Sequence, residues 1–143
     1  MAFQIPTSIR LAPIDLRAGF KAEIMAIVDA AVETDTPSGG NDFLMGTDLA
    51  DLIDGLAGND VITGLAGANQ LYGGAGGDVI LGGQQGRLYG DGDADSGLGD
   101  GRDFIFTENF HKFVLGGGGD DVIFGSSEND VLSAGYGNDT VFG

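Results

Sequence analysis

The chain has 143 residues, 28 of them glycine, and its 22 acidic and 6 basic side chains give a formal net charge of −16. This length predicts one compact domain. So few cations exclude a basic surface for nucleic acid, and the lack of cysteine excludes disulfides and zinc–thiolate sites. Residues 1–10 contain no signal-peptide core, and no apolar run is long enough to span a membrane.

The composition changes near residue 36, because residues 1–36 contain a single glycine, Gly19. In this N-terminal segment we expect an amphipathic helix over residues 16–33, with Asp15 as its N-cap. The helix should cap or cover the rest of the fold; docking on a partner or a membrane surface is the alternative, although its polar face is not basic. Its apolar face is formed by Phe20, Ile24, Ile27, Val28, Ala31 and Val32.

Residues 37–143 repeat with a period of nine. For example, Gly55-Leu-Ala-Gly-Asn-Asp-Val-Ile-Thr is followed by Gly64-Leu-Ala-Gly-Ala-Asn-Gln-Leu-Tyr. Eleven units begin at residues 37, 46, 55, 64, 73, 82, 98, 107, 116, 125 and 134, with an eight-residue acidic insertion at 90–97. Three-residue strands that each point their middle residue inward predict two parallel sheets around an aliphatic ladder. The eighth position of every unit supplies this ladder: Leu44, Ile53, Ile62, Leu71, Ile80, Leu88, Ile105, Val114, Ile123, Leu132 and Val141.

The pattern Gly-Gly-x-Gly-x-Asp-x-aliphatic-x resembles the calcium-binding nonapeptide of the repeats-in-toxin, or hemolysin-type, family, over about 107 of the 143 residues. The resemblance implies an all-β fold, a right-handed parallel β-roll (a β-solenoid), with calcium held between successive turns on each edge. It also implies an extracellular or cell-surface location. The module is shared by secreted enzymes, toxins, adhesins and surface-layer proteins, so the resemblance does not by itself identify a toxin.

Alternate units share an edge of such a roll, so we expect a metal ladder with an 18-residue period along the odd-numbered units. Calcium takes oxygen ligands from carboxylates and backbone carbonyls, and glycine lets a turn expose its carbonyls. Six turns predict about four or five calcium ions on this edge. The carboxylates at the sixth position are Asp42, Asp60, Asp78, Asp103, Asp121 and Asp139. The candidate carbonyls belong to Gly55, Ala57, Gly73, Gly74, Ala75, Gly76, Gly116, Gly117, Gly118 and Gly119.

The even-numbered units depart from this pattern, and we expect few or no ions on their edge. Lys112 would place an ammonium where the metal should lie, and Asp51, Asn69 and Asp130 are the weaker candidates there. In the insertion, acidic residues have the alternating spacing of a calcium loop without the final glutamate of an EF-hand. They are candidates for an additional calcium site, with a solvated acidic loop as the alternative: Asp91, Asp93, Asp95 and Asp100.

Stacked aspartates repel one another, so we expect the chain to be disordered without calcium and folded with it. Ten of the twelve outward-facing residues of the odd units are apolar, so this sheet needs cover from the N-terminal helix or from another chain. The sequence stops one residue into a twelfth unit, and no C-terminal secretion signal is visible. A fragment of a longer protein, an end closed by another subunit and an exposed end are all compatible with this pattern.

Catalytic patterns are missing: His111 is the only histidine, and no nucleophile, metal-protease or phosphate-loop motif occurs. We therefore expect no enzyme activity. The sequence favours an extracellular, calcium-binding structural or assembly module that self-associates into a homo-oligomer or fibre, through its C-terminal end or its apolar odd sheet. The alternative is a calcium-triggered folding and secretion module of a larger type I secreted enzyme, toxin or adhesin.

Overall fold

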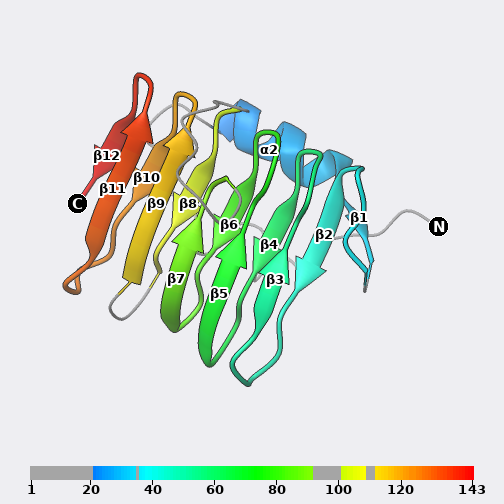
Figure 1. Ribbon diagram of the computed structural model, residues 1–143, viewed down its shortest axis with the longest axis horizontal. Helices are drawn as coiled ribbons and strands as arrows, with labels where there is room; N and C mark the ends of the chain where they lie inside the picture. Colours follow the sequence, from blue (N-terminus) through cyan, green and yellow to red (C-terminus); the bar gives the residue numbers. More distant parts are fainter. Residues whose placement is uncertain (1–20, 35, 92–100, 109–111) are drawn as a thin grey trace.

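The computed structural model describes residues 21–34, 36–91, 101–108 and 112–143. These residues form one helix and two parallel sheets whose strands alternate along the chain, so the predicted parallel β-solenoid is confirmed (Figure 1). The helix is α2 (Lys21–Ala30), and the strands are β1 (Val32–Glu33), β2 (Asp42–Met45), β3 (Leu52–Asp54), β4 (Val61–Thr63), β5 (Ala68–Tyr72), β6 (Val79–Leu81), β7 (Gln85–Tyr89), β8 (Phe104–Phe106), β9 (Lys112–Gly118), β10 (Val122–Phe124), β11 (Val131–Tyr136) and β12 (Thr140–Phe142).

Odd and even units segregate into separate sheets, as their nine-residue period requires. Sheet A has the order β1-β2-β4-β6-β8-β10-β12 and, apart from β1, contains the strands of the odd units. Sheet B has the order β11-β9-β7-β5-β3 and contains the strands of the even units. Each turn between the two sheets therefore lies on one of two edges, which we call the odd edge and the even edge after the units whose strands the turns precede.

The aliphatic ladder lies between the two sheets. Eight of its residues form one buried cluster, and Ile53 and Leu132 pack against it partly buried. Val141, on the end strand β12, is 46% exposed. The insertion leaves the ladder in line, because Ile80 pairs with Ile105 across it in sheet A and Leu88 pairs with Val114 across it in sheet B. The buried members are Leu44, Ile62, Leu71, Ile80, Leu88, Ile105, Val114 and Ile123.

Helix α2 covers the outer face of sheet A (Figure 1). Ile24 and Val28 are buried in a second cluster with outward-facing side chains of the odd strands, among them Phe104 and Val122. The cover expected for this apolar sheet is thus supplied by the chain itself. An exposed ion pair between Glu23 on α2 and Arg102 in an odd turn, with 3.1 Å between Arg102 Nη1 and Glu23 Oε2, also joins the helix to the roll.

The predicted helix is too long at its C-terminal end. It ends at Ala30 rather than at Glu33, because Val32 and Glu33 form β1 and pair with Asp42 and Phe43 of β2. The Val32 N–H donates to the Asn41 carbonyl at 2.9 Å, so pairing with a free sheet edge outweighs continuation of the helix. Val32 is consequently 61% exposed and not part of an apolar helix face. Asp15, Phe20 and the rest of residues 16–20 lie outside the described residues.

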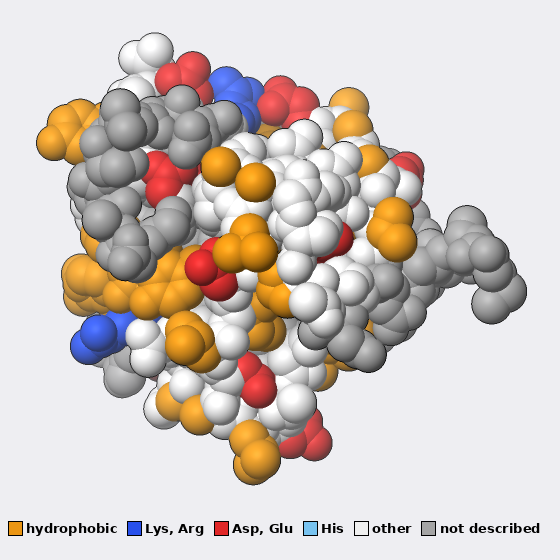
Figure 2. Space-filling model, turned by 45° about the vertical axis from the view of Figure 1, so that its right-hand side comes forward, with side chains coloured by type: hydrophobic (Ala, Val, Ile, Leu, Met, Phe, Trp, Pro, Cys, Tyr) orange, Lys and Arg blue, Asp and Glu red, His pale blue; other side chains and the backbone are white. Residues whose placement is uncertain are grey.

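Neither α2 nor any other described part of the chain provides a helix long and apolar enough to cross a membrane. Figure 2 shows acidic side chains scattered over the face that includes the β1 to β3 end, with few basic ones among them, as the net charge requires.

We predict that Ile24→Ala lowers the free energy of unfolding by about 2–5 kcal/mol, because the substitution leaves a cavity between α2 and sheet A. Leu49→Ala is the matched control, since Leu49 is 75% exposed and its truncation should change the free energy by less than about 0.5 kcal/mol. Urea unfolding in excess calcium measures both values. Equal losses for the two variants would contradict the packing of α2 on sheet A.

Candidate metal-binding edge

The odd turns bring the six predicted aspartates to one edge, each just before or at the start of a strand of sheet A. Asp60, Asp78, Asp103 and Asp121 are fully buried, Asp42 is nearly so, and Asp139 is half-buried. One carboxylate oxygen of each aspartate after the first accepts a backbone hydrogen bond from the aspartate one layer earlier. These bonds run from Asp42 N–H to Asp60 Oδ1 (2.8 Å), Asp60 to Asp78 (2.7 Å), Asp78 to Asp103 (2.8 Å), Asp103 to Asp121 (3.0 Å) and Asp121 to Asp139 (2.9 Å).

The second carboxylate oxygens of the four inner aspartates are unsatisfied. Oδ2 of Asp60, Asp78, Asp103 and Asp121 is buried and has no hydrogen-bond partner. A buried anionic oxygen without a partner is costly, so these four atoms need a cation or a proton.

The acidities of these four groups reflect that cost. Burial, with neighbouring carboxylates adding to it, raises the pKa of Asp60 and of Asp121 to about 7 and that of Asp78 to about 8. The same causes raise the pKa of Asp103 well above its ordinary value.

A glycine leaves room beside each of the four unsatisfied oxygens. A Cβ atom on Gly55 would clash with Oδ2 of Asp60 and with the carbonyl oxygen of Gly73 in the next odd turn. The same pair of oxygens, one carboxylate and one carbonyl, borders this space in three further turns. The glycine, carboxylate and carbonyl are Gly73, Asp78 and Gly90; Gly90, Asp103 and Gly116; and Gly116, Asp121 and Ala134. We call each such space a cradle.

The cradles offer only hard oxygen donors, which is the donor set that calcium prefers. No three His, Cys, Asp or Glu side chains gather into a metal cage within the described ranges, so each cradle relies on backbone carbonyls as well as carboxylates. Of the predicted carbonyls, those of Gly73 and Gly116 border cradles, while Gly55 supplies space. The carbonyls of Gly90 and Ala134 also border cradles, but the sequence analysis did not predict them. Gly90 belongs to the insertion and Ala134 is not a glycine, so neither matches the repeat pattern at the position of Gly73.

The other predicted backbone residues stack turn upon turn beside the cradles. The carbonyl of Ala75 accepts a hydrogen bond from Gly58 N–H at 2.9 Å, and Ala57 forms a parallel bridge with Ala75. The N–H of Gly118 donates to Asp91. Glycine is required where these turns touch, since Gly74, Gly76, Gly117 and Gly119 have φ between 100° and 124° and a Cβ on any of them would clash with the neighbouring layer.

The first predicted ligand, Asp42, is satisfied within the protein. Its Oδ2 accepts hydrogen bonds from the backbone N–H of Ser38 at 2.6 Å and from Ser38 Oγ at 2.9 Å. Asp139, in the last described odd turn, is half-buried and leaves no buried oxygen without a partner. Of the six predicted aspartates, four therefore present a buried oxygen without a hydrogen-bond partner.

On the even edge the equivalent residues are compensated by protein groups. Asp51 Oδ2 accepts from the N–H of Thr47 (2.6 Å), and Asp130 Oδ2 accepts from the N–H and hydroxyl of Ser126 (2.8 and 2.9 Å). Although burial acts to raise it, these bonds and others hold the pKa of Asp130 below its ordinary value. The sequence signal is a serine or threonine four residues before the aspartate, as in Ser38 and Asp42.

Asn69 and Lys112 complete the even edge without a carboxylate. The Asn69 amide donates to the carbonyls of Gly64 (2.8 Å) and Ala66 (3.1 Å). The Lys112 ammonium, buried within the roll, donates to the Gly83 carbonyl at 3.1 Å, and burial lowers its pKa to about 8. On the even edge, the Asn69 amide and the Lys112 ammonium thus donate to turn carbonyls that a metal would otherwise contact.

Of the acidic insertion, Asp91 is described, whereas Asp93, Asp95 and Asp100 lie outside the described residues, as does His111. Asp91 is buried, and its Oδ2 accepts a hydrogen bond from Gly118 N–H at 2.7 Å. It therefore faces the odd edge rather than solvent.

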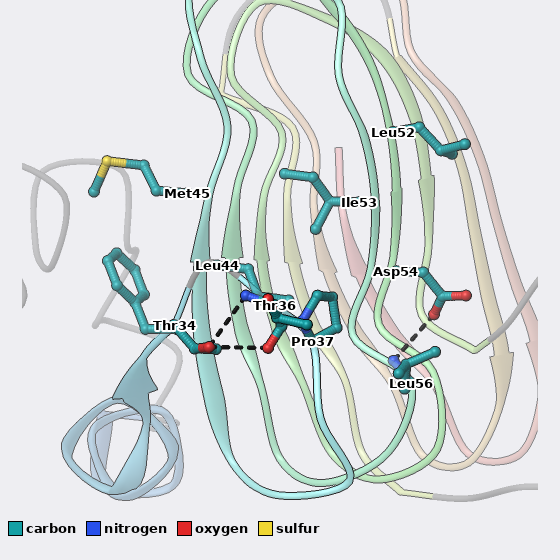
Figure 3. Close-up of a pocket in the computed structure, with 10 residues that line it drawn as sticks. Thr34, Thr36, Pro37, Leu44, Met45, Leu52, Ile53, Asp54 and Leu56 are labelled. Carbon is teal, nitrogen blue, oxygen red and sulfur yellow. Dashed lines mark hydrogen bonds between the residues drawn. The ribbon is translucent and has the colours of Figure 1, made fainter.

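A cavity of about 610 Å³ lies beside β2 and β3 (Figure 3). Ladder residues Leu44 and Ile53 line it, so it is the open end of the core between the sheets. Asp54 is the one ionisable residue in its described lining, and Asp54 Oδ1 accepts a hydrogen bond from Leu56 N–H at 3.0 Å. This lining offers no pair of groups for acid–base chemistry.

Comparison with known families agrees with this geometry. The family model described as the RTX calcium-binding nonapeptide repeat (4 copies) matches residues 37–71, 54–85 and 115–143, which together exceed half of the chain. The matches leave out the insertion and the unit that contains Lys112. Comparisons with curated proteins and with solved structures gave no significant match. The chain therefore belongs to the RTX calcium-binding nonapeptide repeat family, and its repeats form a structural calcium-binding module.

Proposed function

We propose that this chain is a module that folds when calcium binds along its odd edge, with about four ions beside Asp60, Asp78, Asp103 and Asp121 and none on the even edge. The observation that carries the proposal is the set of four buried, unpartnered Oδ2 atoms, each next to a space that only glycine leaves open. The even edge supports the same proposal by contrast, because its equivalent side chains already have hydrogen-bond partners in the protein.

Calcium can control folding because its contribution is as large as the stability of a domain. An ion present at 100 times its dissociation constant adds about 2.7 kcal/mol, so four ions add about 11 kcal/mol. Net stabilities of domains are about 5–15 kcal/mol. Without the ions, burial of four stacked carboxylates opposes folding.

We further propose a location outside the cell. The family is typically extracellular, and the acidic, cysteine-free composition is compatible with that location. The proposed role is structural, with no catalytic step. Because α2 covers the apolar face of sheet A, assembly through that sheet is disfavoured, and end-to-end association is the remaining route to an oligomer or fibre.

A calcium-triggered folding module within a larger secreted protein is the second candidate, and the same cover by α2 favours it. The two roles differ in association. Size-exclusion chromatography with light scattering, in millimolar calcium and in chelator, should show an expanded chain in chelator. Compaction to a monomer in calcium supports the folding module; growth to dimers or fibres supports the assembly role. An unchanged size would contradict calcium-dependent folding in either form.

We predict that Asp78→Asn removes one bound calcium ion, which lowers the free energy of unfolding in excess calcium by about 2.7 kcal/mol. The asparagine keeps an oxygen for the backbone N–H of Asp60 but loses the charge of the carboxylate. Asp51→Asn is the matched control, because Asp51 holds the same position on the even edge and is satisfied by Thr47. Calorimetric calcium titration and urea unfolding measure both effects; an equal loss of calcium from the two variants would contradict a one-sided ladder.

We predict that acid stabilises the calcium-free fold. The folded chain keeps protons on Asp60, Asp78 and Asp121 up to pKa values of about 7–8, whereas the unfolded chain releases them near 3.8. Stability in chelator should therefore fall as the pH rises from 5 to 7.5, a range that lies below the lowered pKa of Lys112. In calcium the trend should reverse, because metal binding requires deprotonated ligands.

Far-UV circular dichroism of a His111→Gln chain measures this, since histidine titration then plays no part. The variant Asp78→Asn, combined with His111→Gln, is the comparison, and its strand content in chelator should depend less on pH. A calcium-free chain with more strand structure at pH 7.5 than at pH 5 would contradict the burial of protonated carboxyls.

A further inference from the structure

The odd turn between β7 and β8 differs from the other odd turns. Gly90 N–H donates to the Leu115 carbonyl at 2.8 Å, and the Gly90 carbonyl accepts from Gly74 N–H at 2.9 Å. Gly90 and Asp91 are thus in register with the first two residues of the neighbouring odd turns, 73–74 and 116–117. Those turns have glycine at the second position, whereas this one carries the carboxylate of Asp91.

The Asp91 side chain turns into the fold. It is only 4% exposed, its Oδ2 accepts the N–H of Gly118, and a Cβ on Gly117 would clash with its carboxylate. It also lies close enough to three ladder aspartates to act on them. Burial is the main cause that raises the pKa of Asp78, Asp103 and Asp121, and the charge of Asp91 adds to the shift of each.

Asp103, the ladder aspartate that follows Asp91 in the chain, has an unsatisfied carboxylate oxygen. It is fully buried, and its Oδ2 has no hydrogen-bond partner. That oxygen and the Gly116 carbonyl border the cradle beside Gly90, the residue directly before Asp91. The Asp91 carboxylate contacts Gly117 and Gly118 of the turn whose Gly116 carbonyl borders this cradle, so a second carboxylate lies at the turn that closes the cradle of Gly90. The turns that begin at Gly55, Gly73 and Gly116 have Leu56, Gly74 and Gly117 at the place of Asp91.

We propose that Asp91 and Asp103 together hold one calcium ion, and that this site is the tightest of the odd edge and fills first. The inference rests on the proposed function, because it concerns one member of the same ladder. Calcium affinity rises with the charge of the ligands, so a second carboxylate strengthens this site relative to its neighbours. The ion also offsets the repulsion between Asp91 and the buried carboxylates of Asp78, Asp103 and Asp121.

The test is calorimetric calcium titration of the full chain after chelation and removal of the chelator. Asp91→Asn keeps the size of the side chain and an oxygen for Gly118 N–H but removes the charge. Asp48→Asn is the matched control, because Asp48 is an exposed acid in an even turn and its loss changes the net charge equally. Asp60→Asn removes an ordinary ladder carboxylate for comparison.

We expect the wild-type chain to bind one ion about tenfold or more tightly than the others, which corresponds to at least about 1.4 kcal/mol. Asp91→Asn should abolish that difference, Asp48→Asn should preserve it, and Asp60→Asn should lose one weaker ion while the tight one remains. A tight ion that survives Asp91→Asn, or equal affinities in the wild type, would overturn the inference and leave the odd-edge ladder intact. A chain that binds no calcium would instead overturn the proposed function.

Gly90→Ala gives an independent test should Asp91→Asn fail to fold. The added methyl group fills the cradle while both carboxylates remain, so the tight ion should be lost. Gly39→Ala is its control, because a Cβ on Gly39 meets no atom within 4 Å. Retention of the tight ion in Gly90→Ala would also overturn the inference.

Discussion

The fold depends on the aspartates of the inner odd turns, whose two carboxylate oxygens have different environments. In each inner odd turn, Oδ1 of the aspartate accepts a backbone hydrogen bond from the previous layer, and Oδ2 is buried without a partner. The first bond fixes the spacing of the turns, but a single N–H does not compensate a buried negative charge. Each of these aspartates therefore links the backbones of two layers and also carries a buried negative charge that a cation must compensate. Folding and metal binding are coupled at the level of one side chain.

The two edges of the roll meet this demand in different ways. On the even edge, a hydroxyl or backbone N–H four residues before the aspartate, an asparagine amide or the Lys112 ammonium supplies the missing donors. On the odd edge, glycine or leucine stands at the place of Thr47 or Ser126, and Oδ2 of Asp60, Asp78 and Asp121 has no donor. Groups of the chain itself satisfy the even edge, whereas the odd edge requires ions, so the dependence of folding on calcium arises at the odd edge alone.

The sequence predicted most of the architecture, because periodicity reports directly on burial. The aliphatic ladder and the separation of odd and even strands followed from spacing alone, whereas spacing left the cover of sheet A open between the N-terminal helix and another chain. The end of α2 did not, since Val32 and Glu33 pair with an edge strand that lies elsewhere in space. The repeat pattern also did not predict which carboxylates have hydrogen-bond partners within the protein. Ser38 donates to Asp42, and serine at that place is not part of the pattern.

The insertion shows why such a roll tolerates change at its turns. The residues on either side of the insertion keep the register of the sheet, because Ile80 pairs with Ile105 and Asp78 N–H donates to Asp103. The extra residues therefore leave the core unchanged. The turn does change, because Gly90 and Asp91 take the places of two turn glycines, and Asp91 brings a carboxylate to a position where the neighbouring turns have no side chain. Core and edge are thus subject to separate physical constraints: the core requires a fixed spacing of aliphatic residues, and the edge requires only that each buried oxygen has a partner. A departure at the edge therefore alters the strength of one site rather than the fold, which makes the order of calcium binding a property of individual turns.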